Sequence, residues 1–220
     1  MFRTLKWLLI LSFIFSFQIY AQLHEIKSVF VSANFGIYDI AQDQFEIAYS
    51  SKIGFAPAIT LGLPLSTSTY LFGKVIYFSK KGVPIISTYE NQNGHAVLVS
   101  EIADGTATFT EWIINAGFLG KIFLSEDYNI EIDAGLAFVN QIEKRISTDK
   151  RIGDGVSVKG IMGLFTGLIL ERNFGKFPLS LIAEVQYNLS IPGIFSFIPN
   201  DGGLHTTLGV RYYFKERRLE

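Results

Sequence analysis

The side chains in this sequence best suited to catalysis are its three histidines, His24, His95 and His205. A histidine held between a serine and an acid can act as a general base, and Ser190 and Asp201 precede His205 closely enough for such a group. The other two histidines lie far away along the chain, and the three have no metal-ligand spacing. We therefore expect no catalytic residues, no metal and no cofactor, with an enzyme built on His205 as the least favoured hypothesis.

A second group of chemically active side chains is charged. Each of its members falls on the polar side of a segment in which apolar and polar residues alternate. Four are basic and four are acidic, and an unpaired charge in a confined interior is costly. We expect a connected network of salt bridges, although a conduit or proton relay is the alternative use of such a group. The eight residues are Lys74, Glu111, Lys121, Glu131, Asp133, Lys159, Glu184 and Arg211.

Strands must position these charges, because the dominant period of the sequence after Lys27 is two. In residues 130–138, for example, Ile130 and Ile132 share one face while Glu131 and Asp133 share the other. Each segment reaches the 9–11 residues that a tilted membrane strand needs. The expected strands are Val29–Tyr38, residues 53–63, Tyr70–Lys80, Thr110–Phe123, residues 130–138, Val156–Glu171, residues 179–190 and Thr206–Phe214.

The connections between these segments alternate between long and short, as they do in outer-membrane barrels. The sequence therefore predicts an all-β fold, an eight-stranded antiparallel closed transmembrane β-barrel. Thr206–Phe214 should pair with Val29–Tyr38 to seal it, and Pro57, which has no amide donor, should interrupt its strand. In the long connection 81–105, the pair Asn93–Gly94 predicts a small hairpin.

The composition decides between a barrel in lipid and one in water. Hydrophobic residues make up 49% of the chain, and charged residues only 18%, below the roughly 25% of soluble domains. A soluble barrel of the lipocalin kind would carry many charges outside, whereas the polar face here is rich in glycine and other small residues that suit a narrow interior. Aromatic residues near the strand ends, among them Tyr38 and Tyr70, are expected to form two girdles facing the lipid.

The N-terminus has the parts of a secretory signal, with Arg3 and Lys6 before an apolar run and a plausible cleavage site after Ala21. The expected organisation is a signal peptide at 1–21, the barrel domain at 22–214 and a charged C-terminal tail at 215–220. With 19 basic and 20 acidic residues, the chain has no strong positive field to attract nucleic acid. The sequence contains no cysteine, so the fold is stabilised without disulfides.

Two stretches carry a family resemblance. The run IGFAPAITLGLPLSTSTYLFGKVIYFSKKGV, residues 53–83, resembles the small outer-membrane β-barrels of the PorT-like type, and TEWIINAGFLGKIF, residues 110–123, is similar to their following strand. The resemblance implies an integral protein of the Gram-negative cell outer membrane, in a family of which one member type is associated with protein secretion. It carries over no catalytic or binding residue.

The function favoured by the sequence is a non-enzymatic structural or accessory role for a barrel with a plugged, salt-bridged lumen. Its partners would be outer-membrane lipid and, through the loop at 81–105, a protein. The alternative is a narrow channel or lateral-exit transporter for small or apolar solutes. Apolar residues expected inside the barrel suggest it, namely Phe72, Ile76, Phe78, Phe165 and Ile182.

Overall fold

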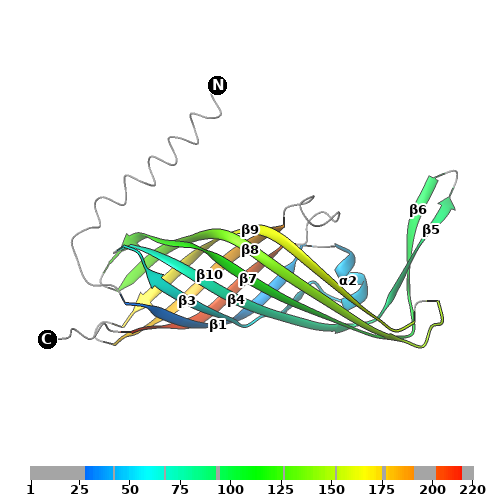
Figure 1. Ribbon diagram of the computed structural model, residues 1–220, viewed down its shortest axis with the longest axis horizontal. Helices are drawn as coiled ribbons and strands as arrows, with labels where there is room; N and C mark the ends of the chain where they lie inside the picture. The colour runs from blue at the N-terminus through cyan, green and yellow to red at the C-terminus, as the bar shows by residue number, and fades with distance from the viewer. Residues whose placement is uncertain are drawn as a thin grey trace, which may run out of the picture.

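The fold is seen in a computed structural model of the chain (Figure 1). It describes residues 28–214 with gaps at 42, 67, 93–94, 126, 152, 175–176 and 191–201, and gives the backbone alone for 43–44, 87–92, 95–100 and 190. The predicted signal peptide at 1–21 and tail at 215–220 lie outside these residues. No helix in the described part of the chain has the length and apolar character to cross a membrane.

The described chain is almost entirely antiparallel β-structure. Its strands are β1 (Phe30–Ile40), β2 (Ile53–Phe55), β3 (Ala58–Pro64), β4 (Thr69–Gly82), β5 (Ile85–Gln92), β6 (His95–Ile102), β7 (Gly105–Leu124), β8 (Tyr128–Ser147), β9 (Gly155–Asn173), β10 (Leu179–Ser190) and β11 (Gly203–Tyr213). The large sheet runs in the order β11-β10-β9-β8-β7-β4-β3-β1-β2, while β5 and β6 form a separate two-stranded sheet.

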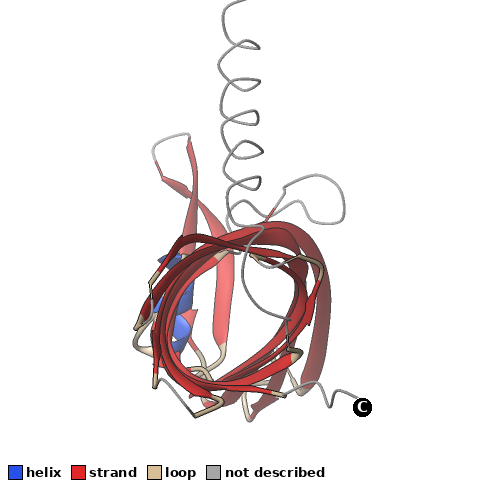
Figure 2. Ribbon diagram, turned by 90° about the vertical axis from the view of Figure 1, so that its left-hand side faces the viewer, coloured by secondary structure: helices blue, strands red, loops and turns tan. Residues whose placement is uncertain are grey.

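The large sheet closes on itself, as Figure 2 shows in a view along the barrel. Strand β11 pairs with β1 over the full length of both, from Phe30 opposite Tyr213 to Ile40 opposite Gly203. Strands β2 and β3 pair with the same β1 and are separated only by Ala56 and Pro57, so together they count as one of eight wall strands. The predicted barrel, its sealing pair and the interruption at Pro57 are confirmed.

Two wall strands are much longer than predicted. Strands β7 and β8 stay paired out to Gly105 and Ser147, so the connection expected at 140–155 shrinks to residues 148–154. The loop expected at 81–105 consists mainly of the predicted hairpin, β5 and β6. Figure 1 shows β4, β7, β8 and β9 continuing beyond the other strands, with the hairpin near their far end. We call the end where β1 begins and β11 ends the inner end, and the opposite end the outer end.

The two faces of the wall differ as the period of two requires. Large apolar side chains point outward and are more than half exposed, including Phe35, Ile59, Phe118, Leu168 and Leu208. On β7, outward side chains from Ile122 to Trp112 span ten residues, which is about 33 Å of strand and about 23 Å of height at a tilt near 45°. That height matches the ~25 Å apolar band of a membrane barrel. The outward face is therefore that of a transmembrane barrel.

Two of the aromatic residues assigned to the girdles point the other way. Tyr38 and Tyr70 are buried inside the barrel, at 0% and 3% exposure. Tyr70 packs edge-on against Phe30 at a ring distance of 5.2 Å, and Tyr38 packs in the same manner against Phe78 at 5.7 Å. The assignment was wrong because it used nearness to the strand end and ignored the alternation that sets the facing.

A short helix that the sequence did not reveal, α2 (Asp43–Tyr49), follows β1 at the outer end. Its buried residues Phe45 and Tyr49 stack on each other and pack against Phe109 of β7, with ring distances of 4.9 and 5.8 Å from that residue. The amide of Val83 donates a hydrogen bond to the carbonyl of Ala48 at 2.9 Å, which ties the helix to the end of β4. The helix is therefore part of the folded barrel end.

Candidate functional site

The predicted charges gather inside the barrel at two levels. The level near the inner end is centred on Arg211, whose guanidinium lies 2.8 Å from Glu131 and 3.5 Å from Glu171. Lys121 lies 3.6 and 3.5 Å from the same two carboxylates. The hydroxyl of Tyr213 donates a hydrogen bond to Glu171 at 2.6 Å. These five residues, which we call the inner cluster, link strands β7, β8, β9 and β11 across the lumen.

The second level lies around Lys74 of β4. Its ammonium group pairs with Glu184 of β10, lies 3.5 Å from Asp133 of β8 and donates a hydrogen bond to Gln186 at 2.6 Å. Asn34 of β1 donates a hydrogen bond to the other oxygen of Glu184 at 3.1 Å. We call these five residues the middle cluster. All of them are at most 2% exposed, so these charges are shielded from solvent.

The two remaining predicted charges lie farther out. Glu111 is 1% exposed and accepts a hydrogen bond from Gln141 at 3.0 Å. Lys159 of β9 is half-buried and stands opposite Gln141 in the β8–β9 register. The structure thus divides the eight residues into the inner cluster, the middle cluster and this outer group.

The space between the clusters is filled. Between Lys74 and Arg211 the lumen contains a cavity of about 10 Å³, which is roughly the room that one water molecule needs. The apolar residues expected to face inward do so, each at most 3% exposed, and they pack into two buried groups. They are Phe72, Ile76, Phe78, Phe165 and Ile182.

At the outer end, α2 packs into the buried apolar group that fills the lumen above the charged clusters. Tyr49 donates a hydrogen bond to Glu143 of β8 at 3.0 Å. Burial, reinforced by the nearby Glu143 carboxylate, raises the pKa of the Tyr49 hydroxyl well above its usual value, so this phenol stays a neutral donor. The helix adds a third closure above the two charged levels.

The residues considered for catalysis do not form a site within the described chain. His205 is fully buried, with its Nε2 3.0 Å from the carbonyl oxygen of Ala56 and its ring edge-on to Tyr38. Asp201 and His24 lie outside the described residues, as do the side chains of Ser190 and His95. Among the residues that the structure describes, no group of three histidines or acids could hold a metal ion.

Sequence reasoning missed Asn34, Glu171, Gln186 and Tyr213, which complete the two clusters. Glu171 shares the odd-numbered face of β9 with Lys159, and Gln186 shares the even-numbered face of β10 with Glu184, so alternation could have found both. Tyr213 shares the parity of the inward Arg211. It was missed because the expected network was limited to charged side chains, and the hydroxyl group of a tyrosine is neutral.

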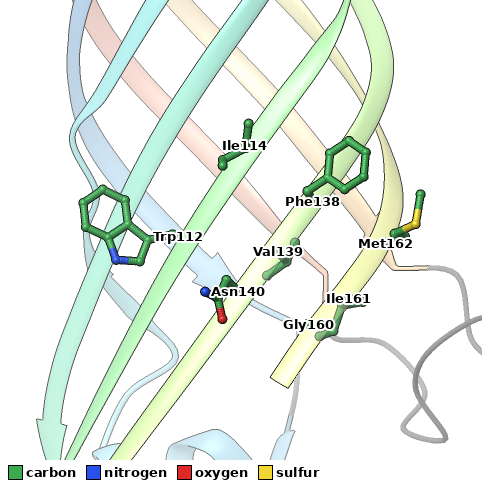
Figure 3. Close-up of a pocket in the computed structure, with 8 residues that line it drawn as sticks. All are labelled: Trp112, Ile114, Phe138, Val139, Asn140, Gly160, Ile161 and Met162. Atoms are coloured by element: carbon green, nitrogen blue, oxygen red, sulfur yellow. The ribbon is translucent and has the colours of Figure 1, made fainter. Parts of the chain in front are cut away.

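A second feature lies on the outer wall. A groove of about 290 Å³ runs across β7, β8 and β9 on the lipid-facing side (Figure 3). It is mainly apolar, and it exists because Gly160 has no side chain where its neighbours on the same face are large. We call it the wall groove. Its lining residues are Trp112, Ile114, Phe138, Val139, Asn140, Gly160, Ile161 and Met162.

Comparisons with known proteins give the fold a wider setting. No family model matches the sequence, and no curated protein is similar to it. Neisserial surface protein A (NspA) superposes with a TM-score of 0.55 at 15% identity, over 86% of this chain and 100% of that chain. Ail, the attachment invasion locus protein of Yersinia pestis, gives 0.49 at 12% identity over 86% and 100%, and the N-terminal β-barrel domain of Pseudomonas aeruginosa OprF gives 0.45 at 14% over 86% and 98%. The chain thus has the fold of the small eight-stranded outer-membrane barrels.

Proposed function

We propose that this protein is an integral barrel of the Gram-negative outer membrane with a closed lumen, and that it serves a non-enzymatic, accessory role by presenting its outer end to a protein partner. The inner end would face the periplasm, where both strand termini lie. The observation that carries the proposal is the filling of the lumen by two buried ion clusters, with α2 above them. A barrel built in this way holds its shape and offers its outer surface.

The outer end supplies the surface. Strand β7 runs seven residues beyond Trp112, about 23 Å of strand, and the β5–β6 hairpin extends from there. At the base of the hairpin, where it meets the outer ends of β7 and β8, Ile102 and Ile146 are 66% and 51% exposed. The exposed Arg151 lies 3.2 Å from Glu101, which joins the hairpin to the β8–β9 turn. We call the outer ends of β7 and β8, together with the β5–β6 hairpin, the projection. Exposed apolar side chains on the projection favour a protein partner.

Export by the segment at 1–21 and kinship with the PorT-like barrels remain predictions from the sequence, and an association with secretion rests on that resemblance alone. A non-enzymatic role agrees with the burial of His205, which contacts a backbone carbonyl. The alternative, a narrow channel for small or apolar solutes, would need a continuous path past Lys74 and Arg211. The 10 Å³ cavity between them offers no such path.

Co-purification from native outer membranes tests the partner-binding role. In a matched variant, residues 87–100 are replaced by an Asn-Gly turn between Ile86 and Glu101, which are paired across the hairpin. We expect a specific partner with the full protein and at least a tenfold smaller yield with the variant, because the projection loses its far half.

Heat-modifiable migration of the variant in gels serves as the control, since β5 and β6 form their own sheet outside the wall. Equal partner recovery with the full protein and with a folded variant would move the contact away from the hairpin. If neither the full protein nor the folded variant recovers a partner, the accessory role is rejected.

A further inference from the structure

The outward face of β4, β7, β8 and β9 changes character step by step toward the outer end. Because the register of the four strands is known, outward side chains can be read as rows across the wall. One row contains Val75, Ile114, Phe138 and Met162 and is wholly apolar. The next contains Tyr77, Trp112, Asn140 and Gly160, and it includes the wall groove. The third contains Ser79, Thr110, Ile142 and Val158, and the fourth Lys81, Thr108, Lys144 and Val156.

The wall groove lies at the aromatic row, where the apolar band of a membrane barrel ends. The rings of Tyr77 and Trp112 lie 4.6 Å apart beside it, and Figure 3 shows Phe138 and Met162 farther from the outer end than Asn140 and Gly160. A volume of about 290 Å³ with mainly apolar lining accommodates part of an acyl chain. The exposed amide of Asn140 supplies a hydrogen-bonding group at the depth where an acyl chain joins its headgroup.

The third and fourth rows lie where a lipid headgroup would lie. Their polar side chains are on β4, β7 and β8, whereas Val156 and Val158 keep the β9 side apolar, at 64% and 65% exposure. Lys144 follows Asn140 by four residues on the same face, about 13 Å along the strand and about 9 Å in height. Between these two levels, the hydroxyl groups of Ser79 and Thr110 lie 3.4 Å apart. Hydroxyl groups placed between an acyl groove and a cationic row match a sugar better than they match a short glycerol link.

The cationic row fits a phosphate. Lys81 and Lys144 are both exposed and stand on either side of Thr108, two strand spacings apart, which is on the order of 10 Å between backbones. Two lysine side chains can close on one phosphate across that distance, with the threonine hydroxyl between them. From Thr106 to Trp112 on β7, and at the outward positions paired with these residues on the three neighbouring strands, no acid opposes the two cations.

We propose that this face binds one phosphorylated glycolipid of the outer leaflet, with an acyl chain in the wall groove and a phosphate between Lys81 and Lys144. The proposal rests on the membrane location proposed above and is independent of the protein partner. The row that contains Lys81 and Lys144 is positively charged and lies farther out than the aromatic residues. Both properties favour a lipid that carries a phosphate. The hydroxyl groups of Ser79 and Thr110 favour a lipid whose phosphate is carried on a sugar.

Lipid titration of the purified barrel in detergent, followed by native mass spectrometry, tests the site. The probe is bisphosphorylated lipid A, compared with dephosphorylated lipid A and with phosphatidylglycerol. We expect one tightly bound lipid A and about fivefold weaker binding for each of Lys81→Gln and Lys144→Gln. Dephosphorylated lipid A should bind the unmodified protein as weakly as bisphosphorylated lipid A binds the double variant Lys81→Gln/Lys144→Gln.

Gly160→Leu tests the groove, because nothing lies within 4 Å of a Cβ placed there and the longer side chain would occupy the hollow. We expect at least fivefold weaker binding. Gly120→Leu is the matched control, since Gly120 is also outward and equally open. Arg172→Gln is the control for charge, because it removes an outward cation at the inner end. Both controls should stay within twofold of the parent protein.

Equal losses in the test and control variants would overturn the site. Binding of phosphatidylglycerol as tight as that of lipid A would overturn the sugar assignment. The protein partner plays no part in this titration, so its result stands apart from the co-purification. If the barrel did not belong to a membrane, neither lipid would bind, and that result would count against the proposed location as well.

Discussion

At the scale of residues, the interior of the barrel is stabilised by cations that each form ion pairs with two carboxylates. Arg211 pairs with Glu131 and Glu171, with Lys121 as a second cation close to both. Lys74 pairs with Glu184 and Asp133 and is the only cation in the middle cluster as we define it. The inner cluster can therefore lose one cation and keep another, whereas the middle cluster cannot. Because of this difference, the barrel should tolerate substitution of Lys74 less well than substitution of Arg211.

We predict that Lys74→Met destabilises the barrel by about 3–5 kcal/mol, because it leaves two buried carboxylates without a counter-charge. Urea unfolding in lipid vesicles gives the free energy. The fluorescence of Trp112, which is 42% exposed on the lipid-facing wall, reports both insertion and unfolding. A double variant with Glu184→Gln should lose less than the sum of the two single variants, because the two groups interact directly.

Arg151→Met provides the comparison for Lys74→Met. Arg151 forms ion pairs with Asp149 and Glu101 at the exposed tip, where its side chain is 60% exposed and solvent screens the charges. Its loss should cost less than about 1 kcal/mol. Similar losses for the two variants would mean that the middle cluster is hydrated and contributes no more than a surface pair.

The facing of most residues could be predicted from the sequence, because alternation along a strand is local. Lys74 and Arg211 are placed correctly by parity alone. The pairing between them and the acids could not be predicted, since Lys74 and Glu184 are 110 residues apart and meet only when the barrel closes. The assignment of Tyr38 and Tyr70 to the lipid is wrong because it used their nearness to the strand ends, although alternation sets their facing.

At the scale of elements, alternation and turn chemistry predict the strands of the wall and the hairpin, but they do not predict how far some strands continue toward the outer end. The hairpin at Asn93–Gly94 follows from turn chemistry. The continuation of β8 beyond Phe138 to Ser147 does not, because its outward residues Ile142 and Lys144 mix apolar and charged types. Helix α2 has only seven residues, too short to be stable alone, and it depends on packing contacts that form only in the folded barrel.

We predict that Phe45→Ala releases α2 from the barrel. Phe45 is 5% exposed and packs against Phe78 and Phe109, so its loss should cost about 3 kcal/mol and raise the open fraction roughly 100-fold. Hydrogen exchange of the Val83 amide, which donates to Ala48, measures this opening by NMR in micelles.

Ile47→Ala is the control on the same helix, because Ile47 is 47% exposed and has little to lose. The exchange rate of Val83 should change by less than threefold in this variant. Equally fast exchange in both variants would show that α2 is held by its ends and that its apolar face does not anchor it.

At the scale of the whole molecule, three closures lie along one axis: the inner cluster, the middle cluster and α2. An eight-stranded barrel has an interior only wide enough for side chains, and here those side chains are large, buried and paired. Solvent-accessible chemistry is thereby concentrated on the outer wall and the projection. A transport role would require all three closures to open together.

We predict that the purified protein gives no unitary currents in planar bilayers at neutral pH, because ions would have to displace Lys74 and Arg211 from their buried partners. Insertion into the bilayer lipid is verified by heat-modifiable migration of a parallel vesicle sample, and a larger porin in the same lipid shows that open barrels are detected. The Phe45→Ala variant should also be silent, since both charged levels remain below the helix. Currents in this variant alone would make α2 the gate of a channel. Steady currents from the parent protein would contradict the closed lumen and with it the accessory role.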